Sequence, residues 1–204
     1  MDDARQLREE QAALWNGSSG EAWVAAQAVL DDLFRPVEAL LADAAAALGA
    51  TNVLDVGCGT GATTIALARR LGASATCTGV DLSAPMIDVA RERAAGGTPR
   101  PRFVCADAGT HPFEPDAFDL LTSRFGVMFF GDPVAVSIGG GGGGNGPEDQ
   151  GSGGGFGGMV RGIGVYSISN GQVRFVPAVD TTALGAMLVL AIGLVAHARR
   201  RRRV

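Results

Sequence analysis

A short strand that runs into a glycine-rich turn constrains this chain more than any other feature. Residues 53–56 read Val-Leu-Asp-Val, and three glycines follow at alternate positions, Gly57, Gly59 and Gly61, before a helical pattern begins at Ala62. Without Cβ atoms, these glycines let the backbone turn sharply and approach a ligand closely. In open α/β sheets, ligands bind in the crevice beyond the carboxyl ends of the strands. The segment therefore predicts a strand, a tight turn and a helix around a nucleotide-like ligand.

Asp55, two residues before the first glycine, narrows the choice of ligand. The spacing Gly57-x-Gly59-x-x-Ala62 also satisfies the loose dinucleotide fingerprint. A carboxylate repels a pyrophosphate, but it attracts a ligand that carries an ammonium and a sulfonium group. Charge therefore favours S-adenosylmethionine over a dinucleotide. A plain tight turn in some other α/β protein is the third alternative.

Acidic residues also end two further predicted strands. Asp81 follows the strand expected over 75–80, and Asp107 follows the strand expected over 102–105. A carboxylate at the second strand tip can accept hydrogen bonds from both hydroxyls of a ribose, although it can also cap the next helix. An acceptor at the third tip faces the exocyclic amine of adenine. Both positions suit an adenosine.

With these motifs in order, residues 11 to about 135 resemble the class I S-adenosylmethionine-dependent methyltransferases, in a small-molecule branch related to the quinone and sterol enzymes. Phe118-Asp119, at the start of the fourth strand expected over 118–122, matches the family's Phe-Asp pattern. The resemblance implies a Rossmann-like α/β fold. It also implies in-line transfer of the sulfonium methyl group to a small-molecule acceptor, with much of the catalysis supplied by positioning.

The resemblance implies roles for individual residues as well. The expected cofactor-binding residues are Asp55, Gly57, Cys58, Gly59, Gly61, Asp81, Leu82, Met86, Asp107, Ala108 and Arg124. Among them Asp81 is expected at the ribose, and Asp107 with Ala108 at the adenine. Met86 is expected either at the adenine face or in the core. No catalytic residue is identified, and a chain whose only histidines are His111 and His197 does not favour a metal site.

Helices are expected before the first strand. The patterns favour helices over 2–14, 21–34 and 36–49, with turn residues between the first two. In the resembling enzymes such a leading segment covers the cofactor cleft. Trp15 and Trp23 either line that cover or pack in an amphipathic core.

Charge and composition exclude some classes of protein. The chain has 17 basic and 21 acidic residues, and residues 199–203 supply five of the basic ones. The body is therefore acidic, which argues against a nucleic acid bound through its phosphates. The three cysteines have no CxxC spacing and are expected as buried apolar residues in a reducing compartment. The acidic amino terminus is not a secretory signal, so the first domain is expected in the cytoplasm.

The resemblance stops at Ala135, where later strands of the family are expected. Between residues 139 and 164, 15 of 26 residues are glycine, a composition typical of a flexible linker. We therefore expect a methyltransferase domain over 1–137, truncated after its fourth strand, and a linker over 138–164. The truncation predicts an exposed fourth-strand edge and a weakened fold.

The carboxy-terminal end has a different character. A short strand-like segment is expected over 165–180, with a hairpin turn near Asn170. Residues 181–204 combine an apolar run with five terminal arginines and resemble a bacterial IPTL/exosortase-type sorting signal. This predicts a transmembrane helix whose arginines stay in the cytoplasm; a buried helix is the alternative.

These observations leave three hypotheses about function. The first is a small-molecule methyltransferase, with an activity that the expected truncation makes doubtful. The second is a membrane-anchored, non-catalytic chimeric protein with a sorting tail. The third is a dinucleotide oxidoreductase. Binding of S-adenosylmethionine separates the first from the others.

Overall fold

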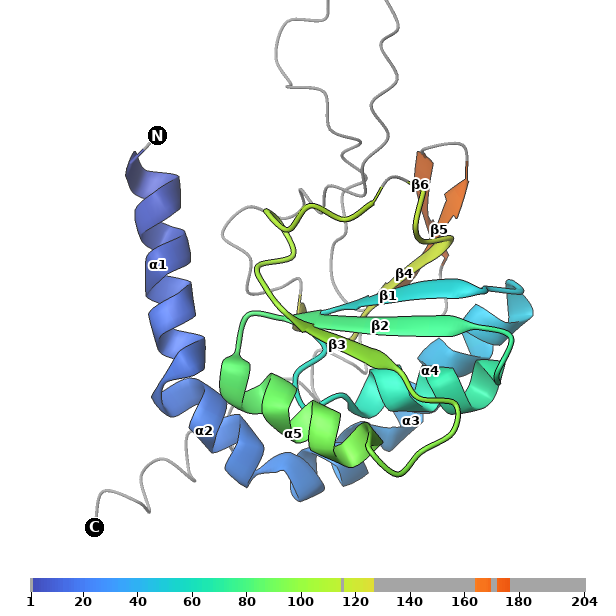
Figure 1. Cartoon of the computed structure of the whole chain (residues 1–204), viewed down its shortest axis with the longest axis horizontal. Coiled ribbons are helices and arrows are strands. Elements are labelled where there is room, and N and C mark those ends of the chain that lie inside the picture. Colours follow the sequence, from blue (N-terminus) through green and yellow to red (C-terminus); the bar gives the residue numbers. More distant parts are fainter. Residues whose placement is uncertain (1, 115, 127–163, 170–171, 177–204) are drawn as a thin grey trace, which may run out of the picture.

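The structure, a computed structural model, describes residues 2–114, 116–126, 164–169 and 172–176. In chain order the elements are α1 (Asp2–Asn16), α2 (Ser18–Ala25), α3 (Gln27–Ala47), β1 (Asn52–Val56), α4 (Ala62–Leu71), β2 (Thr76–Asp81), α5 (Ala84–Ala94), β3 (Arg102–Cys105), β4 (Leu120–Ser123), β5 (Gly164–Ser169) and β6 (Gln172–Val176). The strands form one sheet in the order β3-β2-β1-β4-β5-β6. Helices α3, α4 and α5 lie on one side of this sheet, and α1 stands beside it (Figure 1).

The parallel half of the sheet follows the sequence prediction. Strands β1, β2, β3 and β4 pair in parallel and lie within about two residues of the predicted strands. Helix α4 covers the predicted stretch and ends at Gly72, whose φ of 80° suits a glycine cap. This part of the structure agrees with a Rossmann-like α/β fold, in which parallel strands end on the same side of the sheet.

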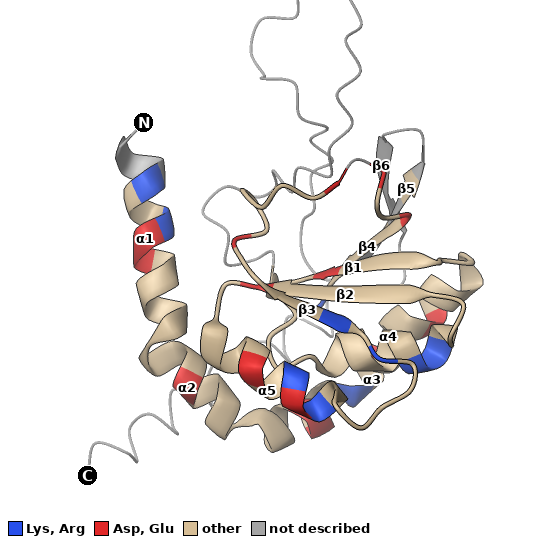
Figure 2. Ribbon diagram, viewed as in Figure 1, with Lys and Arg blue, Asp and Glu red and all other residues tan. Residues whose placement is uncertain are grey.

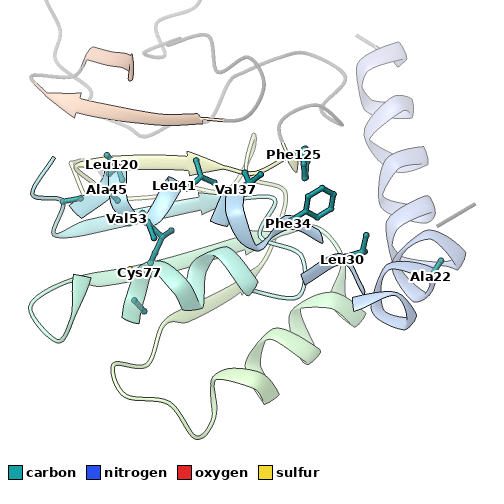
Figure 3. Packing of buried hydrophobic residues seen from close by; sticks show 14 residues of the cluster. Ala22, Leu30, Phe34, Val37, Leu41, Ala45, Val53, Cys77, Leu120 and Phe125 are labelled. Carbon is teal, nitrogen blue, oxygen red and sulfur yellow. The ribbon is translucent and has the colours of Figure 1, made fainter. Parts of the chain in front are cut away.

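The main core lies between α3 and the sheet. Leu30, Phe34, Val37 and Leu41 form one buried stripe of α3 that packs with residues of β1, β2, β4 and α4 (Figure 3). Their spacing of three and four residues places them on one face of a helix. Burial of this stripe fixes α3 against the face of the sheet that α4 also covers.

The prediction of a helix boundary near Pro36 was wrong. Helix α3 continues through Pro36 without a break. A proline inside a helix removes one backbone hydrogen bond, but the buried stripe runs across this position from Phe34 to Val37 and outweighs that loss. The turn predicted between the first two helices shrinks to Gly17, because α2 begins at Ser18.

The prediction of an exposed edge at β4 was also wrong. Strand β5 pairs antiparallel with β4, with Leu120 opposite Ser167 and Ser123 opposite Gly164. Strand β6 then pairs antiparallel with β5, and Ser169 opposite Gln172 leaves two residues for the hairpin turn. A strand edge offers unpaired backbone groups that any extended segment can satisfy, so a segment distant in the sequence covers this one.

Tyr166 anchors the hairpin to a second core on the other face of the sheet. Its side chain is 2 % exposed and lies in a cluster with Leu54, Val56, Val80 and Leu121. Phe113 and Phe118, from the segment between β3 and β4, pack against the same cluster. The hairpin is thus part of the domain core.

Some predictions fall outside the described residues. They are the linker between residues 138 and 163 and the tail over 181–204. Among the helices that the structure describes, none has the length and apolar character to cross a membrane.

Replacing Tyr166 by alanine tests whether the hairpin completes the core. We expect the Tyr166→Ala variant to lose about 3 kcal/mol or more of unfolding free energy, because a large buried ring leaves a cavity. Chemical denaturation measures the difference. Leu48→Ala is the control, since Leu48 is exposed and should change stability by no more than about 0.5 kcal/mol. Equal stability of the two variants would contradict the docking of β5.

Candidate functional site

A cavity of about 360 Å³ opens at the carboxyl ends of β1, β2, β3 and β4. Its wall on the sheet side is formed by Gly57, Cys58, Gly59, Thr60, Val80, Asp81, Leu82, Met86, Ala106, Asp107, Ala108, Gly109, Thr110, Arg124, Phe125 and Gly126. Its other wall comes from the first three helices and consists of Leu7, Arg8, Gln11, Trp15, Trp23, Gln27, Leu30 and Asp31. The volume is within the usual range for a small-molecule site, about 300–1,000 Å³.

The glycine turn shapes the floor of this cavity. Gly57 has a φ of 67°, and a Cβ added there would lie 2.3 Å from the Cα of Gly126. Gly57 thus lets the tips of β1 and β4 touch. At Gly59, with a φ of 55°, an added Cβ would meet only Met86 Sδ, at 3.7 Å. Gly59 is therefore the glycine whose backbone is open to a ligand.

Asp81 joins the tip of β2 to the glycine turn. Its Oδ2 accepts a hydrogen bond of 2.8 Å from the Gly59 N–H, and its Oδ1 accepts one of 2.9 Å from the Ser83 N–H. Burial raises the pKa of Asp81, and backbone N–H donors, Ser83 first, oppose that rise. An ionised carboxylate has about four lone-pair sites, so two remain for a ligand in the cavity.

Asp55 lies beneath the turn and does not line the cavity. Its side chain is 1 % exposed. Thr64 Oγ1 donates a 2.6 Å hydrogen bond to its Oδ2, while Oδ1 has no hydrogen-bond partner among the described residues. Burial raises the pKa of Asp55 from 3.8 to about 7, and the Thr64 hydrogen bond and the Arg124 charge oppose that rise. Figure 2 shows acidic residues on β1 and at the end of β2.

The sequence placed Asp55 and Gly61 among the cofactor-binding residues, and the cavity wall includes neither. A Cβ added at Gly61 would lie 2.8 Å from the Phe103 ring and 2.9 Å from the Ala90 Cβ. Gly61 is therefore a packing position between α4, α5 and β3. Asp55 lies under the turn, where the hydroxyl group of Thr64 in α4 holds its carboxyl group.

Asp107 and Ala108, at the third strand tip, line the cavity, and their contact with an adenine stays a prediction. Asp107 Oδ1 accepts a 2.9 Å hydrogen bond from the Gly109 N–H, which fixes the turn after β3. Leu82 and Met86 also line the cavity, and Met86 is buried. Met86 is thus part of both the cavity wall and the buried interior, and its contact with an adenine face stays a prediction.

Arg124 brings a partly buried positive charge to the cavity wall. Its guanidinium carbon lies 5.2 Å from the centre of the Phe34 ring, and its Nη1 lies 3.9 Å from Glu38 Oε2. Burial lowers the pKa of Arg124, while the charges of Glu38 and then Asp55 oppose that change. Nη1 makes no hydrogen bond within the described part of the chain. The guanidinium is thus held by charge and ring contacts.

Sequence reasoning missed the contribution of α3. Asp31 lines the cavity. Its Oδ2 lies 2.6 Å from Nη2 of Arg93 in α5 and forms an ion pair with it. Arg93 also donates a 2.6 Å hydrogen bond to the Thr60 carbonyl, so one side chain ties α3 to the glycine turn. Residues so far apart in the chain carry no spacing signal that would have revealed this pair.

Both tryptophans of the chain line the cavity. Trp15 and Trp23 meet edge to face with ring centroids 6.2 Å apart. Trp23 also packs against the main core. A place in the cavity wall and a place in the core are therefore compatible for this residue. The aromatic wall faces the polar strand tips across the cavity.

Comparison with known proteins identifies the segment that carries the turn. Residues 53–138 match the family model described as a methyltransferase domain. A 77-residue stretch is 42% identical to the demethylmenaquinone methyltransferase of Staphylococcus aureus strain JH9, and covers 38% of this chain and 32% of that protein. The chain thus spans about a third of the length of the curated relatives it matches.

Solved structures with similar segments include two at moderate identity. The YcgJ protein of Bacillus subtilis is 35% identical, with a TM-score of 0.37, over 40% of this chain and 34% of that one. Phosphoethanolamine N-methyltransferase 2 of Haemonchus contortus, in complex with phosphomonomethylethanolamine and S-adenosylhomocysteine, is 32% identical, with a TM-score of 0.38, over 40% of this chain and 19% of that one. Over residues 53–138 this chain is therefore similar in sequence to methyltransferase domains.

The pKa of Asp55 makes the stability of this domain depend on pH. Because the carboxyl group binds its proton more tightly in the folded state, its contribution to stability is complete below about pH 4 and is lost as the pH rises through about 7. Ionising the folded group costs on the order of 4 kcal/mol. Asp55→Asn cannot ionise, so its stability relative to the wild type should increase between pH 5 and pH 8.

Denaturation at several pH values measures this difference. Asp43→Asn is the control, because Asp43 is exposed and forms a surface ion pair with Arg70, an interaction of small energy. Parallel pH profiles for the wild type and Asp55→Asn would show that Asp55 does not carry the effect.

Proposed function

We propose that the chain binds S-adenosylmethionine in the cavity at the strand tips and transfers its methyl group to a small-molecule acceptor. The observation that carries this proposal is the arrangement of Asp81 and Gly59. The carboxylate of Asp81 is fixed by two backbone N–H groups, lies beside the open face of the glycine turn, and lines a cavity of ligand size. This arrangement lies within the methyltransferase segment.

The residues present fit an adenosine with a cationic amino-acid tail. Asp81 keeps free lone pairs for the two ribose hydroxyls, and Asp107 at the next tip supplies acceptors for the adenine amine. Gly57 and Gly59 form the floor on which the methionine part lies. Asp55 lies under this floor with an unpaired buried oxygen, and its negative charge favours a positively charged group above it.

Bound S-adenosylmethionine supplies an electrophilic methyl group on its sulfonium sulfur. The contribution of the chain is to hold the ribose and adenine so that this methyl group faces the acceptor in line, which is where positioning lowers the barrier. The acceptor loses a proton in the transfer. The described residues do not identify a general base, so we propose no catalytic residue.

We propose that the acceptor has an apolar or aromatic body. The cavity wall opposite the strand tips contains Trp15, Trp23 and Leu30, and Phe125 lines the sheet side. Aromatic side chains of this kind bind flat apolar surfaces. Arg124 lines the sheet-side wall and suits a polar substituent of the acceptor or the carboxylate of the methionine part. The relatives do not decide the acceptor, because this chain spans only a third of their length.

Calorimetric titration of S-adenosylmethionine into the full chain, with Asp81→Ala beside the wild type, tests the proposal. We expect micromolar binding to the wild type, about −8 kcal/mol. Loss of two hydrogen bonds to a charged acceptor should weaken binding by about 10- to 100-fold in the variant. Asp88→Ala removes an exposed acid of α5 that lies outside the cavity and should bind like the wild type.

Two results would contradict the proposal. One is a folded wild-type protein that binds no S-adenosyl ligand. The other is binding of a nicotinamide dinucleotide at this site in place of S-adenosylmethionine, which would return the dinucleotide alternative to first place.

A further inference from the structure

The corner between α1 and α2 sits on the turn that presents Asp81. Trp15, Asn16 and Gly17 form this corner, and the turn consists of residues 81–84. The two segments are far apart in the chain, yet four hydrogen bonds join or brace them. We call this set of contacts the corner clasp.

The clasp supplies hydrogen-bond partners to backbone groups at two helix ends. The Ala84 N–H, at the start of α5, donates a 2.9 Å hydrogen bond to Asn16 Oδ1. Ser83, the residue in the N-cap position of α5, does not cap its own helix. Its Oγ instead donates a 2.7 Å hydrogen bond to the Trp15 carbonyl at the end of α1. The first N–H groups and last carbonyls of a helix need such partners, and here each helix supplies them to the other.

The amide of Asn16 adds a third link. Its Nδ2 lies 2.9 Å from the Ala12 carbonyl and 3.1 Å from the Leu82 carbonyl. Gly20 of α2 packs directly over the clasp, because a Cβ added there would lie 2.1 Å from the Trp15 carbonyl oxygen and 2.8 Å from Ser83 Oγ. The geometry of the corner is thus closely defined by polar and backbone contacts.

Burial does little to hold α1 in place. Of the α1 side chains that the structure describes, residues 5–16, none is buried, and Leu7 and Leu14 are among the exposed large apolar residues. Four residues of the helix nevertheless line the cavity: Leu7, Arg8, Gln11 and Trp15. Figure 1 shows α1 projecting beside the sheet from its junction with α2. An element with so few buried contacts depends on its attachment point for its position.

The attachment point is also part of the ribose site. The N–H of Ser83 donates to Asp81, while its hydroxyl group donates to the end of α1. We propose that Asn16 is a positioning residue for the cofactor: through the corner clasp it sets α1 over the cavity, so that a ligand held by Asp81 is covered by the α1 wall. This inference rests on the proposed function of the site and concerns a residue that does not itself line the cavity.

The test uses the full chain and S-adenosylhomocysteine as the probe. Asn16→Ala removes the cap of α5 and the link to Leu82, and Ser83→Ala removes the hydroxyl link while leaving the Ser83 backbone N–H for Asp81. We expect each substitution to weaken binding by about five- to tenfold, the size of a lost cap. Because both substitutions act through one clasp, the loss of affinity in the double variant should be smaller than the product of the two single losses.

A matched control and two spectroscopic readouts separate positioning from loss of structure. Gln6→Ala changes an exposed amide of the same helix that pairs with Glu10 and lies outside the cavity; it should bind like the wild type. The only two tryptophans of the chain line the cavity, so wild-type fluorescence should change on binding. Ligand should also slow amide hydrogen exchange of α1 in the wild type and in Gln6→Ala. At saturating ligand, Asn16→Ala should show a smaller fluorescence change, because Trp23 belongs to α2, and should lose the slowing of α1 exchange.

The outcomes separate this inference from the proposed function. Absence of S-adenosylhomocysteine binding to the folded wild type overturns both. Wild-type binding together with unchanged affinity and unchanged α1 protection in Asn16→Ala overturns only the role of Asn16. If Asn16→Ala does not fold, Ser83→Ala decides the question by the same two readouts.

Discussion

The hydrogen bonds of the Asp81 carboxylate hold together the parts of the molecule that form the cavity. One oxygen accepts from Gly59 in the turn after β1, and the other accepts from Ser83 at the start of α5. Ser83 in turn holds the end of α1. The Asp81 side chain therefore links the glycine turn to the second strand tip and, through Ser83, to the leading helices. A carboxylate suits this position because it offers several acceptor sites to donors from different directions.

Burial of charge is the second constraint on the site. Asp55 is buried and the Arg124 side chain is 14 % exposed, and each has a polar atom without a hydrogen-bond partner within the described residues. Burial raises the pKa of the carboxyl groups of Asp55 and Glu38 and lowers the pKa of Arg124. Such groups cost stability unless they are paired, and they concentrate where a ligand is handled. The domain thus keeps a carboxyl group beneath the cavity and a guanidinium group beside it.

The local patterns predicted the parallel half of the fold closely, because each depends on neighbours in sequence. The apolar run of β1, the glycine turn and the cap at Gly72 are set by backbone conformation and by side-chain periodicity. Prediction failed where distant contacts decide the outcome. Helix α3 passes through Pro36 because its buried stripe is continuous, and β4 is covered by a strand that begins at Gly164. The hairpin itself was predicted from local patterns, but its pairing with β4 and the burial of α3 across Pro36 depend on distant contacts.

The sequence by itself determined the order of the strand tips and the acidic residues that follow β2 and β3. It did so because strand, turn and charge are adjacent in the chain. Only the tertiary structure decided which residues near the strand tips line the cavity. It turned Asp55 and Gly61 away from the cavity, and it brought α1, with Asn16, onto the turn beside Asp81. Exposure of a side chain to a cavity depends on what packs around it, and that packing joins residues far apart in sequence.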